Sequence, residues 1–443
     1  MSPELLALAA MIILVLGVLF VRIPVALLLA LLGFGGYIVL DGFPRAVSMV
    51  GNELWSTFSS YGLTVIPLFI LMGQICFHSG MSSRLYSAVY AWSGHCRGGI
   101  ALATLLACGG FSAICGSNTA TAATMSSVAL PEMRKYGYHP VLASGTVAAG
   151  TTLGAVIPPS VVAIVVGVQT SSSIERLFLG GIVPGLVLLG LFLVSLAVIA
   201  QLHPHWAPAG ERMPLAAKIR ATPGLVETGL LFFLVIFGLS NGLFTPTEAG
   251  AAGAGLALII GFVQRSLSFR GFIKALDESL RISAMIFLLM AGAAMFGKFL
   301  TLTRVPFTLA DWIAGLAVPA PLVLLLVALI YLVGGMIMDA LALLMITIPI
   351  FFPLAESLGW DTLWFSIFLI IITTMGAITP PVGVSAYVVS TMSGQDGNSR
   401  VPLAQVFRGA AYFLPAFVVC LLAMWAFPDL AVWLPNLIQP LQG

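Results

Sequence analysis

The sequence predicts an all-α polytopic membrane protein with two inverted repeats, each containing a re-entrant hairpin and a helix broken at a Pro-Pro pair. Of the 443 residues, 60% are hydrophobic and only 8% are charged, and the mean hydropathy is +1.10. Soluble globular domains carry roughly 25% charged residues, so that class is excluded. The net charge is +2, with Lys and Arg scattered singly through short loops, which argues against nucleic-acid binding.

One pattern of helix-breaking and hydroxyl residues occurs twice along the chain, at one constant spacing. Pro158-Pro159 corresponds to Pro380-Pro381, and Thr151-Thr152 corresponds to Thr373-Thr374. Internal repeats whose helices are broken near the middle of the membrane are typical of transporters. We therefore expect two copies of one transport unit.

Most of the chain divides into apolar segments that match the length of the bilayer. A spanning helix needs about 20 apolar residues. The first such segment lacks the basic start and the cleavage site of a signal peptide, so we expect it to be a spanning helix as well. The segments lie near 4–20, 24–41, 61–78, 140–168, 177–200, 225–242, 245–263, 282–298, 361–391 and 402–427.

Two apolar stretches, 98–133 and 321–353, are too long for one crossing and are interrupted in the middle. The first is interrupted at Gly109-Gly110 and again at 116–118, and the second at Gly334-Gly335. Because unpaired backbone groups are costly in hydrocarbon, such breaks need protein or a small aqueous cavity beside them. We expect two re-entrant hairpins whose tips meet the helices broken at the Pro-Pro pairs.

Four segments combine helical periodicity with mixed polarity, as is typical of helices that lie along the membrane interface. They are either arms that brace a moving part or ordinary connectors. These segments lie near 44–58, 80–95, 266–280 and 300–315.

The distribution of basic residues predicts the topology. Of the 18 Lys and Arg residues, only Arg45, Arg176, Lys298 and Arg304 fall on the outer side when the first helix runs from outside to inside. By the positive-inside rule, both termini lie outside and the proline-containing linker lies inside. The first hairpin then enters from the cytoplasm and the second from outside, so the repeats are inverted.

This topology divides the chain into scaffold and transport segments. The divisions are 1–96 (first scaffold helices and arm), 97–200 (first transport repeat), 201–224 (cytoplasmic linker), 225–318 (second scaffold helices and arms), 319–427 (second transport repeat) and 428–443 (C-terminal tail).

Several blocks, in family order over nearly the whole chain, resemble the large membrane subunit, DctM, of tripartite ATP-independent periplasmic (TRAP) transporters. They are RIPVAL at 22–27, IPLFILMG at 66–73, RGG at 97–99, the tip at 116–117, ALPEM at 129–133, residues 150–160, residues 334–339 and ITPPVG at 378–383.

The resemblance implies a sodium-coupled secondary importer of the elevator-type ion transporter superfamily, located in the bacterial inner membrane with both termini periplasmic. Its implied partners are a small four-helix membrane subunit and a periplasmic substrate-binding protein that delivers an organic anion. Few residues precede the first helix, so we expect the small subunit to be a separate chain. Na+ is the implied coupling ion, and no organic cofactor is expected.

The two tips and the broken helices supply oxygen atoms of the kind that hard cations prefer. Alternatively, these hydroxyls simply donate to carbonyl groups of the preceding helical turn. Some family members carry an Asp just after the first tip where this chain has Thr119-Ala120-Thr121, which leaves the first ligand set open. The candidates are Ser112, Ser117, Asn118, Thr119, Thr151, Thr152 and Gly154 for sodium site 1, and Gly335, Asp339, Thr373, Thr374, Gly376 and Thr379 for sodium site 2.

Asp339 is the strongest single candidate for a functional residue. A carboxylate at the bilayer centre costs at least ~2.5 kcal/mol, so an acid at that depth indicates function. We expect it to bind sodium or to neighbour a ligand that does. The alternatives are protonated burial, or a salt bridge to Arg304 or Lys298.

The resemblance also implies a substrate path beside the first broken helix. It includes Ser171, Ser172 and Ser173, together with Arg304. Arg304 alternatively serves as an interfacial anchor.

Other functional classes fit less well. An intramembrane enzyme needs paired acids, a Ser-His pair or an HExxH motif, and the sequence contains none at matching depth. A channel or a purely structural subunit does not require two matched Pro-Pro breaks. We therefore expect a transporter and not an enzyme.

Overall fold

The computed structural model describes residues 3–18, 23–306, 308, 319–394 and 400–439, and this part of the chain is helical apart from loops and one bridge between Arg97 and Ala209. Eight of its helices are long and apolar enough to cross a membrane, or nine if the bent pair α21–α22 forms one span. The expected all-α polytopic class is confirmed. Residues 19–20 of the first expected helix, and 307 and 309–315 of the expected segment 300–315, lie outside the described residues.

The first part of the chain contains α1 (Pro3–Leu16), α2 (Val25–Asp41), α3 (Phe43–Phe58), the 3-10 turn η2 (Tyr61–Thr64), α4 (Val65–His78), α5 (Met81–Ser93), α6 (Gly99–Cys115), α7 (Asn118–Lys135), α8 (Pro140–Thr151), α9 (Leu153–Val156), α10 (Val161–Gln169) and α11 (Ile174–Leu202). The second part contains α12 (Leu215–Ala221), α13 (Pro223–Ser240), α14 (Pro246–Val263), α15 (Phe269–Thr303), α17 (Ala320–Ile337), α18 (Ala340–Ser357), α19 (Thr362–Gly376), α20 (Val384–Met392), α21 (Leu403–Ala411), α22 (Leu414–Ala426) and α23 (Asp429–Ile438). The helix α23 lies within the segment expected to be a C-terminal tail.

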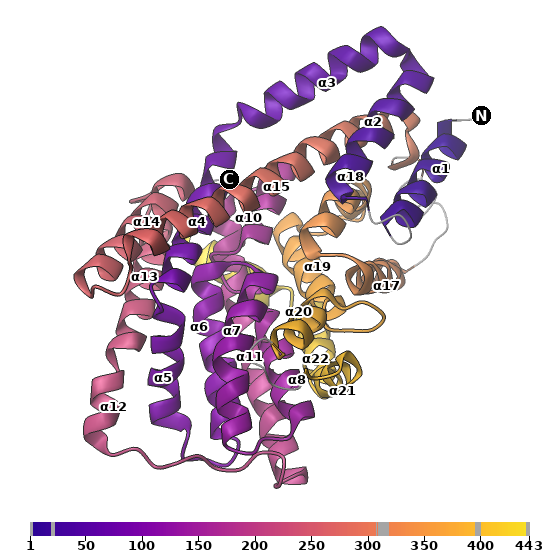
Figure 1. Ribbon diagram of the computed structural model, residues 1–443. Coiled ribbons are helices and arrows are strands. Elements are labelled where there is room, and N and C mark those ends of the chain that lie inside the picture. The colour runs from indigo at the N-terminus through magenta and orange to yellow at the C-terminus, as the bar shows by residue number, and fades with distance from the viewer. Residues whose placement is uncertain (1–2, 19–22, 307, 309–318, 395–399, 440–443) are drawn as a thin grey trace.

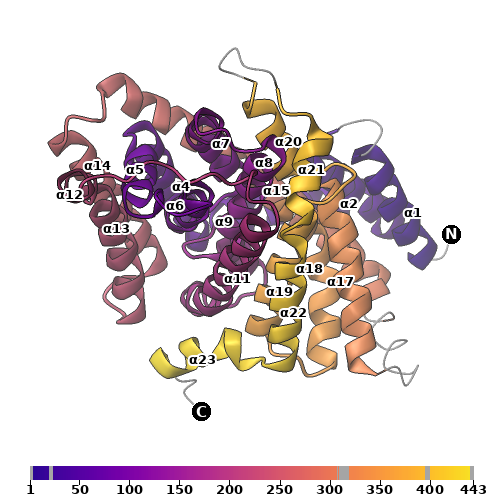
Figure 2. The same cartoon turned by 90° about the horizontal axis from the view of Figure 1, so that it is seen from below.

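The helices form two groups with a third set between them. Figure 2 shows α12, α13 and α14 on one side, α17, α18 and α22 on the other, and α8 and α11 between them. The long helix α15 runs diagonally across the molecule in Figure 1 and packs against both α2 and α4. It therefore connects parts of the fold that are far apart in sequence.

The first hairpin has its turn where the sequence predicted it. Gly116, at φ 62°, ends α6, and the Ser117 side chain caps α7 by accepting from the Ala120 N–H. Hydroxyl side chains at this position satisfy N–H groups that a helix start leaves unpaired. The Gly116 carbonyl accepts from the Val161 N–H at 3.2 Å, so the tip contacts the start of α10, just beyond the break at Pro158-Pro159.

The second hairpin is broken later than predicted. The helix α17 continues through Gly334-Gly335 to Ile337, and the turn falls at Met338-Asp339. The glycines serve packing instead: a Cβ on Gly335 would lie 2.5 Å from the Thr373 carbonyl oxygen on α19. The break occurs where Asp339 caps α18, because a capping carboxylate starts a new helix.

Segment 80–95 was predicted incorrectly as interfacial, and segment 266–280 continues into the predicted span that follows it. Segment 80–95 contains α5, which packs along α6 and α13 with Met81, Leu85 and Tyr86 buried. Segments 266–280 and 282–298 form the single 35-residue helix α15. Polar residues such as Arg84 made these segments resemble surface helices, but in α5 that charge is paired inside the fold.

The linker between α11 and α12 contacts two loops, the one between α5 and α6 and the one between α7 and α8. The Gly98 N–H donates to the Ala207 carbonyl at 3.1 Å, and the Gly210 N–H donates to the Gly94 carbonyl at 2.9 Å. Trp206 stacks on His139, with ring centroids 4.5 Å apart. The segment between α11 and α12 is therefore an ordered strap.

Candidate functional site

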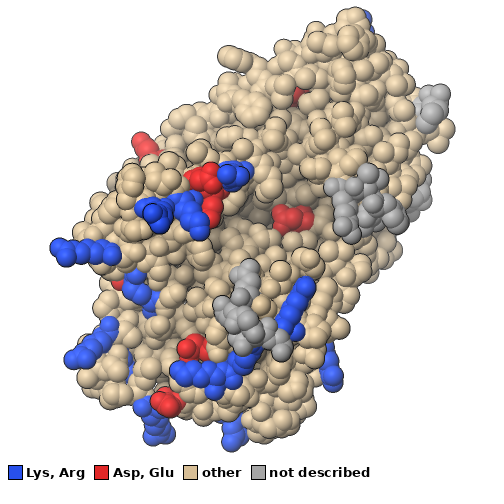
Figure 3. Space-filling model, viewed as in Figure 1, with Lys and Arg blue, Asp and Glu red and all other residues tan. Residues whose placement is uncertain are grey.

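A cavity of 590 Å³ lies where the two hairpin tips approach α4 and α15. Figure 3 shows an acidic side chain in the hollow of the face in view, with Lys and Arg gathered below and to the left of it. The residues that line the cavity are Ile70, Gly73, Gln74, Phe77, Phe111, Cys115, Gly116, Ser117, Asn118, Thr119, Ala120, Ala123, Thr124, Val161, Val162, Glu278, Ile282, Met285, Ile286, Asp339, Ala340, Leu341, Val384 and Val388.

Four helices begin at this cavity. Their first residues are Asn118 of α7, Val161 of α10, Ala340 of α18 and Val384 of α20, and all four line it. The first N–H groups of a helix have no partner within the helix and carry partial positive charge. The cavity wall is therefore suited to an anion even without a basic side chain.

The structure brings the predicted first-site residues together around the first tip. Ser117, Asn118 and Thr119 line the cavity, and a Cβ on Gly154 would lie 3.1 Å from the Ser117 carbonyl oxygen. Ser112 is fully buried. Within the described part of the chain, its Oγ and the Oδ1 of Asn118 have no hydrogen-bond partner.

The first-site threonines make the hydrogen bonds to the preceding helical turn that the sequence left open as an alternative. Thr151 and Thr152 are fully buried and donate to the carbonyls of Ala148 and Ala149 at 2.8 and 2.6 Å. A hydroxyl that donates its hydrogen keeps lone pairs for another partner. This geometry is therefore compatible with either role.

The predicted second-site residues other than Asp339 lie at or near a tight contact between α17 and α19. A Cβ on Gly376 would lie 2.6 Å from the Gly335 carbonyl carbon. Thr373, Thr374 and Thr379 all donate to carbonyls of their own helical turn, at 2.6, 2.8 and 2.7 Å. These residues pack beside the second tip, and none of them lines the cavity.

Asp339 links this second group to the cavity. Its Oδ2 accepts from the Leu341 N–H at 3.2 Å at the start of α18, and the residue lines the cavity with the first tip. Neither salt bridge considered from the sequence is found among the described residues, and Lys298 pairs instead with Glu53 at 3.5 Å. The two tips therefore share one cavity, with one carboxylate between the helix starts.

The proposed helix breaks differ in their surroundings. Pro158 and Pro159 are buried, whereas Pro380 and Pro381 are exposed. The Met336 carbonyl accepts from the Gly383 N–H at 3.0 Å, which joins the second tip to the second break.

The predicted substrate-path residues do not reach the cavity. Ser172 accepts from the Thr170 hydroxyl at 2.9 Å, and Ser173 caps α11 by accepting from the Arg176 N–H. Ser171, at φ 54°, forms the turn between α10 and α11. Arg304 ends α15 in a left-handed conformation and lies outside the cavity lining.

The part of the lining contributed by α4 and α15 was not predicted from the sequence. Gln74 on α4 and Glu278 on α15 line the cavity, and Glu278 Oε2 lies 3.0 Å from His78 Nε2. Glu278 follows Asp277 in segment 266–280, which was expected to lie along the membrane interface, and its partner His78 lies 200 residues away in the sequence. The one available signal was a polar Gln inside the apolar segment 61–78.

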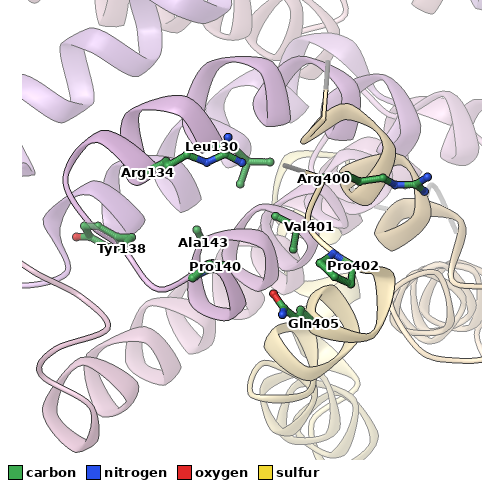
Figure 4. A pocket seen from close by; sticks show the side chains of 9 residues that line it. All are labelled: Leu130, Arg134, Tyr138, Pro140, Ala143, Arg400, Val401, Pro402 and Gln405. Carbon is green, nitrogen blue, oxygen red and sulfur yellow. The ribbon is translucent and has the colours of Figure 1, made fainter. Parts of the chain in front are cut away.

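A second cavity, of 420 Å³, lies away from the tips between α7, α8 and α21. Figure 4 shows Gln405 directed toward it, while the Arg400 guanidinium is turned away from the other labelled side chains. Arg400 instead donates to the hydroxyls of Ser390 and Thr391, each at 3.3 Å. None of the predicted site residues lines this second cavity.

Comparison with known proteins agrees with this architecture. A family model described as "Tripartite ATP-independent periplasmic transporter, DctM component" matches residues 11–430. The chain is 34% identical over 409 residues to the C4-dicarboxylate TRAP transporter large permease protein DctM of Pseudomonas aeruginosa. This alignment covers 91% of this chain and 93% of that protein.

Two further proteins extend the comparison. The chain is 35% identical to the isethionate TRAP transporter permease protein DctMQ of Oleidesulfovibrio alaskensis, over 84% of this chain and 58% of that protein. Its fold is similar to that of the Alcanivorax borkumensis YdaH transporter, with a TM-score of 0.61, 17% identity and 89% of each chain covered. The family match and the first relative together show that this chain belongs to the DctM family, the large permease components of TRAP transporters, and is not an enzyme.

Proposed function

We propose that this chain imports a small organic anion across the bacterial inner membrane, coupled to sodium, after a periplasmic substrate-binding protein delivers it. The observation that best supports this proposal is the cavity at which four helices begin and two oxygen-rich tips meet. Helix starts favour an anion, and hydroxyl, amide and carboxylate oxygens suit a hard cation. Anion and sodium would thus bind side by side.

The proposed mechanism is an elevator built from two inverted repeats. Each tip is joined to a broken helix by a backbone hydrogen bond, from Val161 to Gly116 and from Gly383 to Met336. The tips and broken helices would move as one body, while α4 and α15 form part of the stationary wall. Glu278 lies between Lys274 and Arg281, which we assign to the cytoplasmic side, so we assign this conformation to the inward-facing state.

The partners follow from the family and from its relatives. The relative named DctMQ is longer than this chain, which spans 58% of it. We propose that a small four-helix membrane subunit completes this transporter. Both termini would then lie on the periplasmic side, where substrate arrives.

Uptake into proteoliposomes tests this function. The vesicles contain this chain with its small subunit, and the cognate binding protein presents labelled succinate, isethionate or gluconate under an inward sodium gradient. We expect accumulation that requires both the gradient and the binding protein. Equilibration without accumulation, unaffected by sodium, would contradict coupled transport.

Asp339→Asn tests the carboxylate in the cavity. Asparagine also caps helices, so insertion and folding should persist. Loss of the charge should raise the sodium concentration for half-maximal uptake by at least about tenfold, equivalent to ~1.4 kcal/mol. The matched control is Asp361→Asn, because Asp361 caps α19 in the same way, at 2.9 Å from the Trp364 N–H, but lies outside the cavity. Unchanged sodium dependence in Asp339→Asn would remove this residue from the sodium site.

A further inference from the structure

We infer that the substrate carries a single anionic group together with hydroxyl or amino groups, and that Glu278 selects against a second anionic group. The inference rests on the proposed function and specifies the substrate class for the same cavity. It depends on the charges of the cavity wall, on oxygen atoms that lack donors, and on which structural elements carry them.

The cavity wall provides no positive side chain for a second anion. Asp339 and Glu278 line it, and no Lys or Arg is among the described lining residues. His78, at 3.0 Å from the Glu278 carboxylate, at most neutralises that carboxylate when it is protonated. The net side-chain charge of the described wall is therefore never positive.

The helix starts belong to one part of the cavity lining. The starts of α7, α10, α18 and α20 all belong to the tips and broken helices. A sodium ion beside Asp339 would neutralise charge in that same part. Elsewhere in the lining, α15 contributes Glu278, so a second anionic group of a substrate that reaches this residue would meet a carboxylate. Like charges repel each other in a partly desolvated site.

Two acceptors in different parts of the cavity lining need donors. Asn118 is only 6% exposed, and its Oδ1 has no hydrogen-bond partner within the described part of the chain. Glu278 uses Oε2 toward His78, which leaves Oε1 as an acceptor. A hydroxyl or amino group satisfies both oxygens, whereas a carboxylate satisfies neither. Charge and hydrogen bonding thus favour the same class of substrate.

Two pairs of acids of matched length test this inference. The first pair is succinate and 4-hydroxybutyrate, and the second is glucarate and gluconate; within each pair, one carboxylate is replaced by a hydroxymethyl group. Binding is measured by calorimetry on the purified complex of this chain with its small subunit, in sodium and without the binding protein. In each pair we expect the monoacid to bind at least about tenfold more tightly.

Glu278→Gln identifies the residue responsible. The amide removes the repulsion, so the ratio between diacid and monoacid should fall to less than about threefold. The matched control is Asp277→Asn, which alters the preceding acid, paired with Arg281 at 2.8 Å outside the cavity lining, and should leave the ratio unchanged.

The outcomes separate this inference from the proposed function. A diacid that binds as tightly as its matched monoacid overturns the inference but leaves sodium-coupled transport intact. An unchanged ratio in Glu278→Gln overturns the role of Glu278. If no organic anion accumulates under a sodium gradient, the proposed function fails first, and the inference fails with it.

Discussion

The charge network around Glu227 gives a prediction whose size follows from its geometry. Glu227, on α13, is 7% exposed. Its Oε2 accepts from Arg84 Nε at 3.0 Å and Nη2 at 2.9 Å, and its Oε1 accepts from Gln264 at 2.6 Å. Arg84 Nη1 also donates to the Ser79 carbonyl at 2.7 Å. One carboxylate therefore joins α5 and α13 to the end of α14.

Replacing Glu227 with leucine leaves the Arg84 charge without its carboxylate. Breaking one partner of a buried ion pair costs roughly 3–5 kcal/mol. The Arg84 side chain is 30% exposed, so water relieves part of the loss. We therefore expect the lower value, a destabilisation of about 3 kcal/mol, or roughly a 150-fold change in the folding equilibrium.

A double-mutant cycle measures this coupling. Unfolding in mixed micelles of increasing SDS fraction, followed by tryptophan fluorescence, gives the free energy of unfolding for Glu227→Leu, Arg84→Leu and the double variant. Two apolar side chains replace the pair in the double variant, so it should recover most of the loss. Single-variant losses that simply add would refute the coupling. Breaking the exposed Arg281–Asp277 pair should cost less than about 1 kcal/mol.

Three further predictions concern helix contacts and pH. Gly376→Ala places a Cβ 2.6 Å from backbone of α17, so this variant should lose about 1–3 kcal/mol of stability, measured as a lower melting temperature, and should also show reduced uptake. The control is Gly255→Ala, whose Cβ has no atom within 4 Å and which should change neither the melting temperature nor uptake. Gly145→Ala places a Cβ 2.2 Å from backbone of α21 and should likewise separate α8 from α21, detectable as faster proteolysis of their connecting loops. Burial lowers the pKa of His139, whose neutral ring accepts from the Val141 N–H. The contribution of this residue to the free energy of unfolding should therefore be fully present above about pH 6.5 and decrease below it. A melting temperature that is independent of pH between 5 and 7.5, roughly the range in which histidine titrates, would contradict this assignment.

The sequence identified features that depend on local chemistry. Gly116 at the first tip and the two Pro-Pro pairs were recognised because glycine ends helices and proline interrupts their hydrogen bonds whatever surrounds them. Such rules act over a few residues, so one sequence is enough to apply them. The cavity that both tips share was not predicted and is seen only in the structure.

Features that depend on distant partners were missed. Arg84 indicated a surface helix because its partner Glu227 lies 143 residues further along the chain. Gly335 was interpreted as a break because the sequence does not show that α19 packs against it. Glu278 was missed for the same reason, since its position on the cavity wall depends on how α15 crosses α4. In each case tertiary packing decided the outcome.

The length of α15 has a mechanical consequence. With 35 residues it is about 52 Å long, because each residue adds about 1.5 Å. The hydrocarbon core is only about 30 Å thick, so this helix is longer than a perpendicular crossing requires. Glu278 lies toward one end, beside the cavity, and Lys298 lies toward the other, tied to Glu53 on α3. The ion pair between Lys298 and Glu53 would therefore fix one end of α15 to α3 and so help to set the position of the cavity wall at the other end.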